Sequence, residues 1–233
     1  MKKPLDRVLE PELMDTPEDA ADYDSMDHSG VNRLFVVDFL EGYRGGRVLD
    51  IGTGTAQIPI ELCQQYPGAI VDAVDAAMHM LAVAEKNIKR AGFSVRINLH
   101  LAPAQSLPFA GESFPAVMSN SIVHHIPEPR QVIAEMVRVL APGGWLLVRD
   151  LLRPIDVETL NRLVDLHAAG ANKHQRGMFR DSLNASLTLE EIRQIVHSLG
   201  YNQEDVKVGR PRAFRASLAF RLADHRGTAF GSA

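Results

Sequence analysis

The chain has 233 residues, 45% of them hydrophobic and 23% charged, so it can bury one sizeable core. A formal net charge of -4 leaves no overall positive field to hold nucleic acid, and no stretch has the roughly 18 to 20 uninterrupted apolar residues of a membrane span. The single cysteine, Cys63, excludes an internal disulfide, and the first residues lack the apolar run of a signal peptide. We therefore expect a soluble cytoplasmic protein, a monomer or homodimer, with no nucleic-acid partner and no integral membrane segment.

Short apolar runs alternate along the chain with longer helical patterns, an order that is typical of a parallel sheet with crossover helices. The apolar runs predict strands at 47–51, 70–74, 95–101, 115–119 and 144–150. Helices fill the intervals. Pro129 is suited to open one of them, and Pro142-Gly143-Gly144 is expected to end it before the next strand.

The last quarter of the chain predicts a helix followed by two paired strands. Thr188 and Glu191 form a capping-box pattern ahead of a run with helical periodicity, and Gly200 supplies the stop. Residues 214–222 alternate apolar and polar side chains, as a strand with one buried face does. The connection from 205–208 is too short for a parallel crossover, so we expect these two strands to be antiparallel neighbours.

A glycine-rich loop follows the first predicted strand in Val48–Ala56, VLDIGTGTA. Gly52 and Gly54 let the backbone turn sharply towards a ligand, and the next helix directs its N–H groups into the same crevice. Dinucleotide-binding enzymes use a similar loop, but Gln57 stands where their third glycine falls. Asp50 would repel a pyrophosphate and attract the ammonium of a methionine moiety. The loop therefore favours S-adenosylmethionine, with an NAD-dependent oxidoreductase as the alternative.

A second acid, Asp75, closes the next predicted strand. Its carboxylate can accept both hydroxyls of an adenosine ribose, or it can cap the helix that begins near Met78, and the two roles are compatible. Ala76 and Met80 would offer small or soft apolar surface to an adenine, although Met80 could equally belong to the core.

Four segments in this order resemble the motifs of class I methyltransferases that use S-adenosylmethionine, especially the small-molecule branch similar to enzymes of ubiquinone and menaquinone biosynthesis. They are VLDIGTGTA, VDAVDAAMHML, APAQSLPFAGESFPAVMSNSIVHHI and RVLAPGGWLLVRDLLRP, and the resemblance covers roughly residues 20–222. It implies a Rossmann-like methyltransferase fold, an α/β structure with a seven-stranded, mostly parallel sheet, an antiparallel C-terminal hairpin and helices on both faces. It also implies S-adenosylhomocysteine as the product.

The resemblance assigns cofactor contacts residue by residue. Asp50, Gly52, Thr53 and Gly54 would surround the methionine part, Asp75 the ribose, Ala104 and Gln105 the adenine, with Asn120 and Ser121 lining the pocket. The chain departs from the family where Ala102-Pro103-Ala104 replaces a segment that carries an acid for the adenine amino group. Adenine recognition is therefore expected to differ from the family pattern.

His124 and His125 are the candidate catalytic residues. A histidine near its ordinary pKa of about 6.5 can take a proton from an acceptor hydroxyl or amine, although a packing role at the start of a helix is the main alternative. Because ligand pairs on a helix usually stand three or four residues apart, their adjacency predicts no metal site.

Direct in-line methyl transfer to a small polar or anionic acceptor is the expected reaction, since the sulfonium is itself a reactive electrophile. We expect residues 1–45 to form a helical lid and residues 46–233 a single compact methyltransferase domain with a cap insertion at 153–187. Candidate acceptor contacts are Tyr23, Met26, His28, Asn32, Arg149, Asp150, Arg153, Arg180 and Asp181, with an ion-paired surface as the alternative for the charged ones. A catalytically silent methyltransferase-like partner protein is a further alternative.

Overall fold

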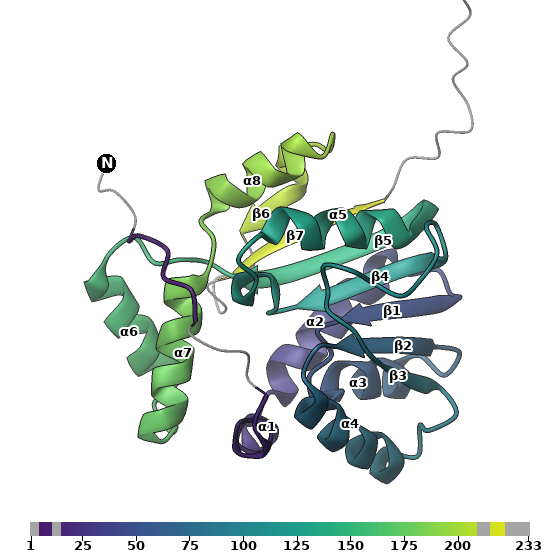
Figure 1. The fold of residues 1–233 in the computed structure, drawn as a ribbon, viewed down its shortest axis with the longest axis horizontal. Helices are drawn as coiled ribbons and strands as arrows, with labels where there is room; N and C mark the ends of the chain where they lie inside the picture. Colours follow the sequence, from purple (N-terminus) through teal and green to yellow (C-terminus); the bar gives the residue numbers. More distant parts are fainter. Residues whose placement is uncertain (1–4, 11–14, 209–214, 222–233) are drawn as a thin grey trace, which may run out of the picture.

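A computed structural model describes residues 5–10 and 15–208 together with the backbone of 215–221. Its centre is one sheet, shown in Figure 1, whose spatial order is β3 (Ile97–Leu101), β2 (Ile70–Asp75), β1 (Arg47–Ile51), β4 (Phe114–Asn120), β5 (Leu140–Leu151), β7 (Arg215–Arg221) and β6 (Val206–Val208). The first five strands are parallel, and β7 runs antiparallel to both β5 and β6. The predicted mostly parallel sheet and its antiparallel C-terminal pair are confirmed.

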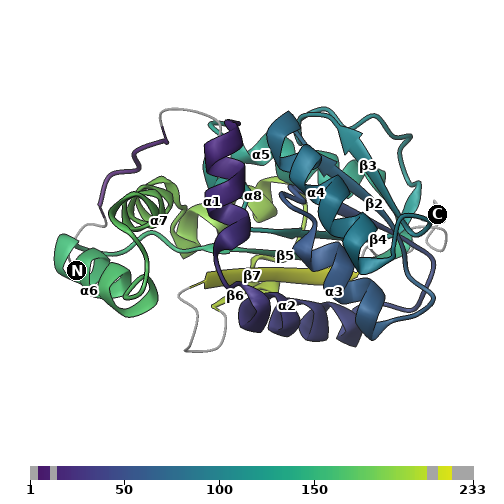
Figure 2. The same cartoon turned by 90° about the horizontal axis from the view of Figure 1, so that it is seen from below.

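Helices cover both faces of the sheet, as expected (Figures 1 and 2). On one face lie α2 (Ser29–Gly42), α3 (Gln57–Gln65) and α4 (Met78–Ala91), which share a core with inward side chains of β1 and β2. On the other lie α5 (Pro129–Val139) and α8 (Leu189–Ser198), which pack against β4 and β5. Strands buried on both faces explain why the sequence shows apolar runs and little alternation in this part.

The Pro142-Gly143-Gly144 segment lies inside a strand and does not end a helix. The helix before it, α5, already ends at Val139, and β5 begins at Leu140. Phe114 pairs with Leu140, whereas Ala116 pairs with Trp145, so the segment lies in an irregular, bulged part of β5. The predicted helix stop and the strand start at 144 were therefore wrong, because a bulge accommodates the proline and glycines inside the strand.

Three helices lie beyond the carboxyl ends of the central strands (Figures 1 and 2). One is α1 (Pro17–Ser25), and the other two form a pair within residues 153–187, α6 (Val157–His167) and α7 (Lys173–Ala185). Asn172 and Gln175 form a capping box on α7 that the sequence analysis missed, whereas the predicted box of Thr188 and Glu191 is confirmed on α8. Figure 2 shows α1 between α4 and the α6–α7 pair.

The short helical turns η1 (Val123–His125) and η2 (Gln203–Asp205) complete the described elements. Across the described ranges, no helix has both the length and the apolar character required to cross a membrane.

Candidate active site

The glycine loop leaves β1 in a conformation that requires glycine. Gly52 has φ +75° and Gly54 φ +54°, and a Cβ at Gly52 would lie 1.9 Å from Cγ2 of Ile122. The Gly52 and Thr53 amides donate to the carbonyl of Val74, at 2.8 and 3.0 Å, which fixes the loop against β2. The loop thus brings backbone from β1 close to the ends of β2 and β4, the point where the strand order reverses and open α/β sheets bind their ligands.

Asp50 is buried beneath the glycine loop. It is 2% exposed, and its Oδ2 atom has no hydrogen-bond partner among the described residues. Burial raises the pKa of Asp50 to about 7, and the charge of Asp75 adds to this rise. Burying a carboxylate in this way is unfavourable unless a ligand compensates it, and a ligand ammonium does so.

Three hydroxyls near the same strand ends also lack a partner within the described part of the chain. They belong to Thr53, Thr55 and Ser121, and each oxygen is buried. Ser121 has φ 62°, an unusual value outside glycine, and its amide donates to the carbonyl of Arg149 at 2.8 Å. Unsatisfied buried polar atoms around a glycine loop are what a polar ligand would satisfy, so the residues fit a cofactor with an ammonium and hydroxyl groups.

The carboxylate of Asp75 accepts hydrogen bonds from two backbone amides. The Gly54 amide donates to its Oδ2 at 2.7 Å, and the Ala77 amide donates to its Oδ1 at 2.9 Å, just before α4 begins. The pKa of Asp75 is raised by burial, against the effect of these backbone bonds. Asp75 therefore fixes the backbone just before α4, but the N-cap residue is Ala77 and no side chain caps the helix, so the capping alternative was wrong and ribose binding stays a prediction.

The adenine contacts also stay predictions. Ala104 is buried and Gln105 half-buried, whereas Ala76 is exposed. Met80 packs with Ala20 of α1 and so belongs to a small core cluster, the alternative given for it above.

The helix α1 lies over the glycine loop. A Cβ at Gly54 would stand 3.6 Å from Cε1 of Tyr23. Asp24 accepts hydrogen bonds from Nε2 of Gln57 at 3.2 Å and from Nδ2 of Asn87 at 2.7 Å. Gln57 also accepts one from Nδ2 of Asn32 at 3.2 Å, so this residue links α3 to both N-terminal helices. The same glutamine that departs from the dinucleotide-binding pattern thus positions the cover of the loop.

A cavity of about 540 Å³ lies between the α1–α2 connection and the α6–α7 pair. Its described lining is mostly apolar, with a few polar side chains: Ser25, Met26, Asp27, His28, Val31, Leu151, His167, Ala168, Gly170, Ala171, Gln175, Phe179 and Leu183. The rings of His28 and Tyr23 lie 4.9 Å apart, so the cavity adjoins the side chain that covers the glycine loop. Its volume suits a small molecule.

The charged candidates for acceptor binding do not line this cavity. Arg149 pairs with Asp38 and lies over the ring of Phe35, while Arg153 is 7% exposed and pairs with Glu191 at 2.6 Å. The other two are also elsewhere: Arg180 donates to the Asn161 side chain at 2.8 Å, and Asp181 is exposed. Arg149 and Arg153 are used in local ion pairs on separate elements, so binding of an acceptor by these four residues stays a prediction.

Both candidate catalytic histidines are held by carboxylates. His124 Nδ1 lies 2.5 Å from Oδ1 of Asp150, and the pKa of Asp150 is lowered because the charge and hydrogen bond of His124 outweigh its burial. His125 Nδ1 lies 2.5 Å from Oε2 of Glu10, and this carboxylate raises the pKa of His125 against the opposing effect of burial. Asp150 thus contacts His124 and does not line the acceptor cavity.

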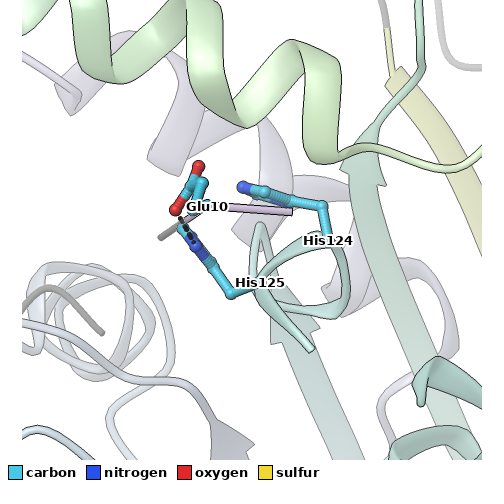
Figure 3. Close-up of side chains that lie close together, drawn as sticks. All are labelled: Glu10, His124 and His125. Atoms are coloured by element: carbon cyan, nitrogen blue, oxygen red, sulfur yellow. Dashed lines mark hydrogen bonds and ion pairs between the residues drawn. The ribbon is translucent and has the colours of Figure 1, made fainter. Parts of the chain in front are cut away.

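Glu10 was missed by the sequence analysis because nothing in its surroundings marks it, and its partner is 115 residues away. The structure brings this glutamate to the two adjacent histidines: Figure 3 shows Glu10 beside both rings, whose centroids are 4.1 Å apart.

The segment that carries the loop and the strand ends also matches a known family: residues 49–148 match the methyltransferase domain family. The fold is that of class I, Rossmann-like methyltransferases, and the matched segment, which holds the glycine loop and the ends of the central strands, is similar to their methyltransferase domain. Several of the curated relatives that the chain resembles are UbiE enzymes.

Individual relatives show the same resemblance. The chain is 28% identical over 123 residues to the ubiquinone/menaquinone biosynthesis C-methyltransferase UbiE of Geotalea daltonii, covering 52% of each protein. With UbiE of Geobacter sulfurreducens it shares 26% identity over 190 residues, 81% of this chain and 70% of that one. It therefore spans about half the length of the first of these curated relatives. A solved structure from Methanococcus maripaludis, described as an S-adenosyl-L-methionine-dependent methyltransferase, shares the fold with a TM-score of 0.70 at 15% identity, over 95% of this chain and 99% of the other.

Proposed function

We propose that this protein binds S-adenosylmethionine at the carboxyl ends of β1, β2 and β4 and transfers its methyl group to a small-molecule acceptor. The observation that carries the proposal is the buried carboxylate of Asp50, whose Oδ2 atom has no hydrogen-bond partner among the described residues and which lies beneath a loop of positive-φ glycines. A cationic ligand with a polar body is what this arrangement would stabilise.

Each part of the cofactor has residues that fit it. Asp50 would pair with the α-ammonium, and the amides around Gly52 and Gly54 would lie along the methionine part. Asp75 retains acceptor capacity for ribose hydroxyls beside its two backbone bonds, because a carboxylate has about four lone-pair sites. When bound, the cofactor supplies an electrophilic methyl group. The protein then has to orient the acceptor's nucleophilic atom and exclude water.

The acceptor would occupy the cavity between the α1–α2 connection and the α6–α7 pair. Met26, Phe179 and Leu183 favour an acceptor with an apolar body, and His28 and Gln175 offer hydrogen bonds that could fix its orientation. In this proposal residues 1–45 act as the lid and residues 153–187 as the cap of one methyltransferase domain. His124 and His125 lie beside this region on η1, and their catalytic role stays a prediction.

Calorimetry with S-adenosylhomocysteine and, separately, with NAD tests the cofactor. We expect one S-adenosylhomocysteine per chain and no measurable NAD binding. Tighter binding of NAD would favour the oxidoreductase and overturn the proposal.

A screen of metabolite extracts with S-adenosylmethionine labelled on its methyl group tests the reaction. Transfer of label to a small molecule is the expected result. A protein that binds S-adenosylhomocysteine but labels nothing in any extract would match the silent partner instead. The variant Asp50→Asn serves as the control in both experiments, because it removes the charge and conserves the shape.

A further inference from the structure

Three side chains that the cofactor site does not use converge beside η1. Glu10, His124 and His125 each offer one atom able to bind a metal, and these three atoms all lie within 4.8 Å of one another. Figure 3 shows the Glu10 carboxylate and the two rings turned towards a common centre. His124 is buried and the other two are half-buried, so the group is not a solvent-exposed cluster of charges.

The N-terminal strap, residues 5–10, brings Glu10 to this position. The Val8 amide donates to the carbonyl of Asn184 at 3.1 Å. Arg7 donates through Nε to the carbonyl of Ala185 at 2.7 Å and through one terminal nitrogen to the carbonyls of Ile126 and His124, at 2.9 and 3.1 Å. These bonds join the strap to both α7 and the segment that follows η1. The carboxylate is thereby fixed in place before any ion arrives.

Hydrogen bonds from neighbouring residues orient the three side chains. The Ser182 hydroxyl donates to Oε1 of Glu10 at 2.7 Å, which leaves Oε2 directed towards His125. Asp150 holds Nδ1 of His124 at 2.5 Å and also accepts hydrogen bonds from the backbone amides of His124 and Leu151, so it is surrounded by donors as an ionised carboxylate is. Nδ1 therefore carries the proton, and Nε2 presents its lone pair. Carboxylates hold metal-binding histidines in this same way in proteins generally.

We propose that Glu10, His124 and His125 bind a divalent first-row transition metal ion, with Asp150 as a positioning residue. Two imidazoles and one carboxylate suit zinc, iron, cobalt or manganese, whereas magnesium and calcium prefer oxygen ligands alone. The ion takes the place of the proton shared by Glu10 and His125, and His124 adds Nε2. Ligand atoms about 2.1 Å from a tetrahedral ion are roughly 3.4 Å apart, so Oε2 and Nδ1 must separate by less than about 1 Å from their present distance.

Three protein ligands leave coordination positions for a further molecule, as sites with three protein ligands do in catalytic proteins. The site stands next to the cofactor loop, since Ile122, which packs on Gly52, immediately precedes η1. An oxygen of the methyl acceptor is the chemical group that such an ion would hold. This last role rests on the proposed function, whereas metal binding itself does not.

The test uses the full chain, dialysed against a chelator and titrated with Zn²⁺ by calorimetry and with Co²⁺ by visible absorption. We expect one ion per chain and cobalt ligand-field bands typical of nitrogen and oxygen coordination. Glu10→Gln and His124→Ala should each weaken binding at least about tenfold, and Asp150→Asn should weaken it by roughly 10- to 100-fold. His79→Asn is the matched control, because His79 also pairs with a carboxylate, that of Asp15, but lies on α4.

Binding of S-adenosylhomocysteine is measured on every variant. Retained affinity shows that a variant is folded, and it separates failure of the metal site from failure of the proposed methyltransferase function. Wild-type protein that binds neither ion at one per chain would overturn the proposal. Glu10→Gln and His124→Ala binding both ions as tightly as the wild type would overturn it too.

Discussion

Asp50→Asn should stabilise the protein without cofactor and at the same time weaken cofactor binding. The pKa of Asp50 is about 7 in the folded chain, above the value of about 3.9 expected in an unfolded one. For a carboxyl group whose folded pKa is raised, the fold favours the neutral form. The stability that this carboxyl group contributes to the wild-type protein is fully present below pH 4, falls as the pH rises towards 7, and is lost above pH 7. The variant removes this pH-dependent loss.

The size of the effect follows from the two pKa values. About three pH units at 1.36 kcal/mol each give roughly 4 kcal/mol as an upper limit at pH 8, against roughly 1.5 kcal/mol at pH 5. An amide buried without its own partners costs about 1–3 kcal/mol at either pH, so it lowers the gain but not its pH dependence. The free energy of unfolding of the variant minus that of the wild type should therefore be about 1–3 kcal/mol larger at pH 8 than at pH 5, which means that the variant gains more stability at pH 8.

Urea unfolding at the two pH values, together with calorimetric titration of S-adenosylhomocysteine at pH 8, measures both effects. Loss of a bond to a charged group corresponds to roughly 10- to 100-fold weaker cofactor binding. Asp72→Asn is the control, since Asp72 is equally buried on the neighbouring strand but pairs with Arg47 and His100. That variant should lose stability and keep its cofactor affinity. An Asp50→Asn protein with unchanged affinity, or with no gain at pH 8 over pH 5, would refute the reasoning.

Three further outcomes are expected. Gly52→Ala should abolish S-adenosylhomocysteine binding, measured by calorimetry, because its Cβ would overlap Ile122. Gly92→Ala is the control, because Gly92 has a similar positive φ but open space around it. This control should lower the free energy of unfolding, measured by denaturation, and leave binding unchanged. Ala171→Phe should fill part of the acceptor cavity and raise the KM for an acceptor found in the label screen about tenfold, with cofactor affinity unchanged; an unaltered KM would place the acceptor elsewhere. Arg7→Ala should release the strap and lower Zn²⁺ affinity without affecting cofactor binding, and equal Zn²⁺ affinity would contradict this.

The fold was predictable because its signals are local. Apolar runs, turn glycines and the capping box of Thr188 each act over a few residues, and the crossover order follows from connection lengths. The error at Pro142-Gly143-Gly144 arose because a bulge and a helix stop use the same residues. Only the register of β5 against β4 shows that these residues form a bulge and not a helix stop.

The site was predictable only in part, for the same physical reason. Asp50, Gly52 and Gly54 lie within one loop, so their chemistry could be inferred from neighbours in the chain. Glu10 meets His125 across 115 residues, a contact that local patterns do not encode. Arg153 shows the same limit from the other side: charge near the strand ends suggested ligand binding, and only the three-dimensional structure shows its pairing with Glu191.

The strap also imposes an order on how the molecule is completed. Its residues precede every group that they contact, since the carbonyls that they bond belong to residues 124–127, in the middle of the sequence, and 184–185, in its last quarter. The glycine loop, by contrast, needs only β1, β2 and the turn from β4 to be present. A growing chain can therefore form its cofactor cradle while the three-ligand cluster is still incomplete, and a protein shortened at the N-terminus would keep the first and lose the second. Assembly of the cluster thus reports that the strap has docked on η1 and α7.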